Sequence, residues 1–106
     1  MKSTYSVYVV QLDKTVLEKK QFSQANPNYN PKKACLYVGM TGLTPKARFA
    51  NHKAGRKASK YVRDFGMYLR RRLFEKYNPM TREEAEKMEV ELAEKLRSKG
   101  YAVWQK

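Results

Sequence analysis

The chain has 106 residues, enough for one compact domain over residues 1–106, and its 23 Lys and Arg against 10 Asp and Glu give a formal net charge of +13. So large an excess on so small a body indicates a polyanionic partner. The single cysteine, Cys35, excludes an internal disulfide framework and a cysteine-clustered zinc site, and no apolar run approaches the ~18 residues that span a bilayer. We therefore expect a cytoplasmic protein with no membrane segment.

The first third of the chain predicts two strands separated by a long irregular segment. Residues 4–12 are rich in β-branched and aromatic types, and residues 35–40 form a short apolar run. Between them, residues 13–34 are polar and rich in turn-forming Asn and Pro. So long an irregular segment is typical of a functional insertion, and we expect residues 19–33 to contribute little to the core.

Two helices and a third strand follow. Thr44 and Pro45 form a helix start, with Thr at the N-cap and Pro at the first helical position, and this helix extends to Ala54. A second short helix is predicted over residues 59–65. Residues 68–74 favour a strand, although a helix there is nearly as plausible.

A capping box opens the last helix, with Thr81 at the N-cap and Glu84 three residues later. The helix ends at Gly100 and is followed by a short extended piece over residues 101–104. The order of elements predicts an α/β (α+β) fold in which a small three-stranded antiparallel sheet is flanked by helices.

Basic residues are concentrated between Thr44 and Arg72, where ten bases accompany one acid, Asp64. A phosphate backbone selects such a block, because neutralised phosphates release counterions, whereas solubility does not require charge of a single sign. The block does not separate DNA from RNA. Nine of its members are candidate nucleic-acid contacts: Lys46, Lys53, Arg56, Lys57, Lys60, Arg63, Arg70, Arg71 and Arg72.

Glu89 lies inside the apolar stripe of the last helix. With Ala85 at 0° and about 100° per residue, Leu92 falls near 340°, Leu96 near 20° and Glu89 near 40°. A carboxylate on a core face costs several kcal/mol unless it is paired, hydrogen-bonded or bound to a metal. Glu89 is therefore either a metal ligand or a glutamate at the edge of the stripe that reaches water or an arginine.

Two strand tripeptides and two helix motifs follow one another in a specific order. The tripeptides are Ser6-Val7-Tyr8 and Tyr37-Val38-Gly39, and the helix motifs are Arg48-x-x-x-His52 and Ala85-x-x-x-Glu89-x-x-Leu92. In this order they resemble the GIY-YIG nucleases, whose later helix carries a metal-binding glutamate. The resemblance spans most of the chain.

The resemblance implies a single-domain endonuclease that hydrolyses phosphodiester bonds in DNA with one divalent ion, Mg²⁺ or Mn²⁺, bound by Glu89. Arg48 would neutralise the phosphate and His52 would orient a water or shuttle a proton. Tyr8 would be the general base and Tyr37 would lie beside the attacking water. A phenol needs a lowered pKa for that role, and we expect the local positive field to supply it.

The chain departs from the family pattern in three ways. Ser6 replaces the first glycine of the pattern. Tyr8 and Tyr37 are separated by 28 residues, which is more than usual in the family, so residues 13–34 form an insertion. No asparagine follows the last helix. A non-catalytic nucleic-acid-binding module on the same fold is the alternative function, and a basic subunit of a larger assembly is the third. Specificity would come from the insertion, from dimerisation or from a partner protein, or it would be low, and the oligomeric state stays open.

Two aromatic residues have open roles. Trp104 and Phe49 are candidates for stacking on bases or for packing in the core.

Overall fold

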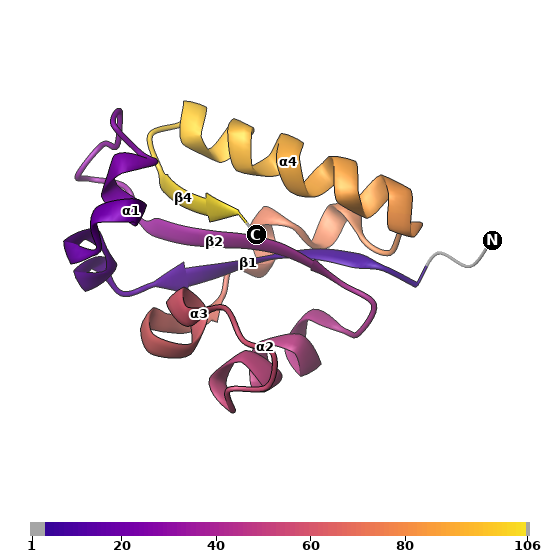
Figure 1. Cartoon of the computed structure of the whole chain (residues 1–106). Helices are drawn as coiled ribbons and strands as arrows, with labels where there is room; N and C mark the ends of the chain where they lie inside the picture. The colour runs from indigo at the N-terminus through magenta and orange to yellow at the C-terminus, as the bar shows by residue number, and fades with distance from the viewer. Residues whose placement is uncertain (1–3, 106) are drawn as a thin grey trace.

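A four-stranded mixed sheet organises the fold (Figure 1). In the computed structural model, which describes residues 4–105, the strands are β1 (Ser6–Leu12), β2 (Cys35–Thr41), β3 (Gly66–Leu69) and β4 (Ala102–Gln105). Their order across the sheet is β3-β1-β2-β4. β1 pairs antiparallel with β2 and with β3, while β4 pairs parallel with β2.

Helices cover both faces of this sheet. Figure 1 shows α4 along one face, with α2 and α3 on the opposite face. The α-helices are α1 (Lys20–Gln24), α2 (Pro45–Lys53), α3 (Lys60–Phe65) and α4 (Arg82–Ser98), and short 3-10 helices cover Lys14–Glu18, Arg71–Leu73 and Glu75–Tyr77. Because both faces are covered, the residues from Val7 to Val10 on β1 are all buried.

The α/β class is confirmed, but the predicted three-stranded antiparallel sheet is wrong. The short extended piece at the end of the chain is a fourth strand, and it lies parallel to β2. At 1.5 Å per residue the 17-residue α4 is about 25 Å long, and at about 3.3 Å per residue the seven-residue β2 is about 23 Å. α4 therefore runs the length of the sheet and returns the chain to the end where β2 begins, which is the crossover that parallel pairing requires.

The helix starts are confirmed, and one predicted strand is partly wrong. Thr44 accepts a hydrogen bond from the backbone N–H of Ala47, and Thr81 and Glu84 form both bonds of the capping box. The third strand occupies Gly66–Leu69 and gives way to 3-10 turns, so most of the predicted strand over residues 68–74 is not extended.

The segment between β1 and β2 is part of the core, contrary to the prediction that residues 19–33 contribute little. Phe22 is fully buried. The side chain of Asn26 donates to the carbonyls of Phe22 and Val103 and accepts from the N–H of Val103 on β4. A five-residue helix is too short to display an apolar period, so the sequence pattern did not reveal this packing.

No helix within residues 4–105 combines the length and the apolar character that a bilayer crossing requires.

Candidate active site

Tyr8 and His52 form the buried centre of the site. Tyr8 lies on β1 and is 1% exposed, and His52, near the end of α2, is 0% exposed. The Tyr8 hydroxyl lies 2.8 Å from Nε2 of His52. The α2 helix therefore packs on the sheet through a polar pair instead of through apolar side chains alone.

The backbone of Ser59 determines the tautomer of His52. Its N–H donates a hydrogen bond to Nδ1 of His52 at 3.1 Å, so Nδ1 is an acceptor and the ring hydrogen is on Nε2. Nε2–H then donates to the oxygen of Tyr8. It follows that the hydroxyl hydrogen of Tyr8 points to a group other than His52.

Tyr37 on β2 completes an aromatic cluster with these two side chains. Its ring centroid lies 6.1 Å from that of Tyr8 and 5.7 Å from that of His52. Both tyrosines are on the sheet face that carries α2, because Tyr8 pairs with Gly39 and Tyr37 is two residues from Gly39 on the same strand.

Gly39 provides the space for this cluster. A Cβ at position 39 would lie 2.7 Å from the Tyr8 hydroxyl oxygen and 3.0 Å from Cε1 of Tyr37. These distances are shorter than van der Waals contact, so the glycine is required by the close approach of the tyrosine rings. The third letter of the Tyr37-Val38-Gly39 tripeptide was the sequence signal for this position.

Arg48 lies one helical turn before His52 and borders an open pocket. Its guanidinium donates to the backbone carbonyls of Arg56 and Lys57 at 3.2 and 2.9 Å, which ties α2 to the loop that follows it. The pocket has a volume of about 280 Å³, and Arg48 lines it together with Tyr37, Lys57 and Trp104.

Burial raises the pKa of Tyr8 well above its usual value of 10.0, and the charge repulsion of Tyr37 adds to the rise. Arg48 opposes this through its charge and a side-chain hydrogen bond. The expectation that the positive field lowers the pKa of Tyr8 is therefore wrong for the protein alone, because the loss of hydration outweighs one guanidinium. Burial also raises the pKa of Tyr37, and the negative charge of Glu89 is its second cause.

Glu89 is buried within the apolar stripe of α4, at 7% exposure. Its Oε1 accepts a hydrogen bond from Nε2 of Gln105, on β4, at 3.0 Å. Glu89 also lines a second, larger pocket with Thr41, Arg82 and Glu86. Because the charge of Glu89 raises the pKa of Tyr37, Glu89 interacts electrostatically with the aromatic cluster, although α4 packs on the other face of the sheet.

Within residues 4–105, no three His, Cys, Asp or Glu side chains gather into a metal-binding cluster.

Three of the nine basic candidates contact protein groups through their side chains, and a fourth borders the Arg48 pocket. Nζ of Lys53 donates to the carbonyls of Arg63 and Gly66, and the Arg63 side chain also pairs with Asp64 at 2.9 Å. The Arg70 side chain donates to Gln11, and Lys57 borders the Arg48 pocket. Lys53 and Arg70 thus help to hold the fold.

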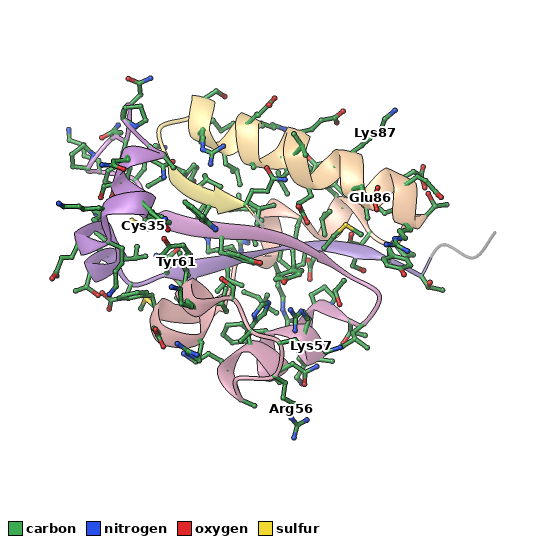
Figure 2. All side chains as sticks on the ribbon, in the orientation of Figure 1. Cys35, Arg56, Lys57, Tyr61, Glu86 and Lys87 are labelled. Atoms are coloured by element: carbon green, nitrogen blue, oxygen red, sulfur yellow. The ribbon has the colours of Figure 1, made fainter. Side chains whose placement is uncertain are left out.

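The remaining basic candidates are spread over the surface near α2 and α3. Lys46 and Arg71 line one pocket, and Lys60 lines another. Figure 2 shows Arg56 pointing away from the sheet on the α2 side. Arg72 is exposed. The block covers α2, α3 and the 3-10 helix after β3, and its members line different pockets.

Three further residues support the site, and sequence reasoning did not single them out. Gln105 contacts Glu89, Ser59 orients His52, and the Asn78 side chain bonds both the N–H and the carbonyl of Val7 beside Tyr8. These contacts join segments that are far apart in the chain or involve backbone groups. An Asn-Pro pair is by itself only a turn signal, and it does not indicate these contacts.

Comparison of the chain with protein-family models, with curated proteins and with solved structures found no match.

Proposed function

We propose that the chain is a single-domain, metal-dependent endonuclease of the GIY-YIG type that hydrolyses phosphodiester bonds in DNA. One observation carries the proposal: Tyr8, Tyr37, Arg48 and His52, which lie on three separate elements, form one cluster that opens into a pocket through Tyr37 and Arg48, and Glu89 acts on Tyr37 through its charge. Perturbed titratable groups that converge beside a pocket are typical of active sites.

Glu89 fits a hard divalent cation. Mg²⁺ and Mn²⁺ prefer oxygen ligands, and Mg²⁺ often binds through only one or two protein carboxylates. The carboxylate of Glu89 is held by Gln105 near the sheet edge, where the family pattern has an asparagine and this chain has none. A cation bound there supplies positive charge to the phosphoryl group and the leaving oxygen.

The residues of the chain divide the remaining work. Two N–H groups of Arg48 donate to the loop carbonyls and hold the guanidinium in place, so its permanent charge and its other N–H groups are available to a non-bridging phosphate oxygen. The Tyr8 oxygen accepts from His52, so the hydroxyl hydrogen of Tyr8 points away from His52, toward Tyr37, which lines the pocket. When Tyr8 loses that proton, the same His52 N–H stabilises the phenolate, because a hydrogen bond to the charged form favours it.

His52 is a positioning residue in this proposal. It is fully buried, and one ring nitrogen is held by the Ser59 N–H while the other faces Tyr8. A hydrogen on Nδ1 would point at the N–H of Ser59, which already donates to that nitrogen. His52 therefore acts as a fixed hydrogen-bond donor to Tyr8 and not as a proton shuttle.

The raised pKa of Tyr8 favours one rival, a nucleic-acid-binding module on the same fold without cleavage. A protonated Tyr8 cannot accept a proton from water. In the nuclease proposal, a cation held by Glu89 would have to supply the positive charge that lowers this pKa in the loaded site, whereas the rival needs no such change.

Nicking of supercoiled plasmid with Mg²⁺, and with chelator as control, tests the proposal. Glu89→Gln removes the negative charge of the cation ligand, so this variant should cut orders of magnitude more slowly. It keeps the side-chain shape and an oxygen for Gln105, so its melting temperature should change by no more than about 4–8 °C. Glu94→Gln is the matched control, because Glu94 is exposed on the same helix, and it should cut like the parent. DNA binding without metal-dependent nicking by the parent would favour the binding module.

A further inference from the structure

Trp104 lies beside Tyr37 at the edge of the sheet. The parallel register of β2 and β4 pairs these two residues directly, so their side chains project from the same face. β4 has only β2 as a strand neighbour. The indole is therefore next to the proposed reaction centre and at the border of the sheet.

Two aromatic rings support the indole from within the protein. The ring of Tyr61 on α3 lies 5.0 Å from that of Trp104 in an edge-to-face arrangement, and Phe22 lies 6.5 Å away, nearly parallel. Tyr61 and Phe22 also contact each other, at 5.6 Å. Figure 2 shows Tyr61 between α3 and the sheet. This packing fixes the orientation of Trp104 before any ligand binds.

The indole is nevertheless only partly buried. It borders the pocket of about 280 Å³ that also holds Arg48, Lys57 and Tyr37. This volume is close to the lower limit of small-ligand pockets, roughly 300 Å³, and suits one nucleotide better than a duplex. A guanidinium, an ammonium and an aromatic ring around one such space match the phosphate and the base of a single nucleotide.

We propose that Trp104 is a stacking platform for one unpaired nucleobase next to the phosphate bound by Arg48. The proposal rests on the proposed function and specifies its substrate: DNA with an unpaired nucleotide at the cleaved position, as in a flap, a loop or a single strand. A base inside a duplex has both faces covered by its neighbours, so it has no face to offer the indole. Stacking tolerates any base, and the platform selects structure instead of sequence.

Trp104 is the only tryptophan of the chain, so its fluorescence reports directly on the platform. We would titrate the metal-free protein with short oligothymidylate and, separately, with a blunt duplex of similar charge, while the anisotropy of labelled DNA reports binding. We expect strong quenching by oligothymidylate and much weaker quenching by the duplex at equal saturation. Saturation with oligothymidylate without a change in emission, or failure of oligothymidylate to bind, would overturn the proposal.

Variants at position 104 provide a second measurement. Trp104→Leu should weaken oligothymidylate binding by about 5- to 150-fold and duplex binding little, whereas Trp104→Phe should keep most of the affinity. Circular dichroism checks that the variants are folded. If Trp104→Leu is unfolded, the quenching of the parent's emission and the affinity of Trp104→Phe for oligothymidylate test the platform instead. Equal losses for both DNA forms would contradict the platform.

The platform and the nuclease can fail separately. Quenching by oligothymidylate in a protein that never nicks DNA would support the platform and refute the nuclease. Metal-dependent cutting with no quenching, and with equal rates on flapped and blunt DNA, would support the nuclease and refute the platform.

Discussion

Tyr8 experiences opposing influences on its proton. The sheet and α2 exclude water from it, Tyr37 adds charge repulsion, and Arg48 attracts the phenolate. Burial is the largest of these, so the free protein keeps Tyr8 protonated at neutral pH. In the proposed nuclease, Tyr8 would therefore accept a proton only after positive charge is brought to the site, and the rate of cutting should depend on that charge.

The raised pKa of Tyr8 predicts how alkali destabilises the fold. Above about pH 10 the unfolded chain releases this proton while the folded chain retains it, so the free energy of unfolding falls as pH rises. Tyr8→Phe lacks the group, and its unfolding free energy should fall less steeply, by up to about 1.4 kcal/mol per pH unit. Urea denaturation of both proteins between about pH 9 and pH 11 measures the difference. Parallel pH profiles would mean that Tyr8 titrates normally in the folded state.

The residues of the candidate site were partly readable from the sequence. Glu89 was found because a helical period places it among Ala85, Leu92 and Leu96, and its burial confirms that placement. Gln105 was not found, because its contact with Glu89 depends on the pairing of β4 with β2. The pKa of Tyr8 was misjudged, since a list of nearby charges contains no information about burial.

At the scale of elements, local signals were reliable and pairings were not. The capping residues Thr44 and Thr81 predicted two helix starts, and a segment rich in β-branched and aromatic residues and a short apolar run predicted β1 and β2. The extended piece that forms β4 was predicted, but its parallel pairing was not, because four residues carry no period and its partner strand is more than sixty residues away. The packing of α1 was not predicted either, because it depends on β4.

Asn26 joins α1 to β4 and should be important for stability. Replacement by Ala removes the Asn26 bonds to the Val103 N–H and to the Phe22 and Val103 carbonyls, of which the Val103 carbonyl keeps its bond from Arg97, and the Arg97 Nε loses a contact. We expect Asn26→Ala to lower the free energy of unfolding by about 2–4 kcal/mol. Urea denaturation measures this loss.

Asn28 provides the matched control for that experiment, because it is exposed and only two positions away. Asn28→Ala should change the free energy of unfolding by less than about 0.5 kcal/mol. Equal, small effects of both substitutions would restore the interpretation of residues 19–33 as a dispensable insertion.

At the scale of the whole molecule, the charge is unevenly used. A net charge of +13 favours polyanions over the whole surface, but only some of the Lys and Arg side chains lie near the Arg48 pocket. Lys57 borders it, whereas Lys87 on α4 points into solvent on the opposite side of the molecule (Figure 2). Lys53 is bound to two backbone carbonyls.

Lys57→Ala and Lys87→Ala remove the same charge from opposite sides. Loss of a phosphate contact lowers the magnitude of the slope of log K against log salt by about 0.9, so Lys57→Ala should show that drop for unrelated DNA sequences. Lys87→Ala should leave the slope unchanged. The measurement is DNA binding by anisotropy over a range of salt concentrations, and identical slopes for both variants would place the DNA away from the Arg48 pocket.

A substitution at Gly39 would separate DNA binding from DNA cleavage in the proposed nuclease. One methyl group at this position would push the Tyr8 ring away from His52 and alter no charge. We expect Gly39→Ala to bind DNA with the affinity and salt dependence of the parent but to nick plasmid far more slowly, and undiminished nicking would show that the ring has room to adjust. Because its carboxylate and its cationic side chains are intact, such a variant would hold uncut DNA in the presence of metal, and the substrate could be captured in place for structure determination.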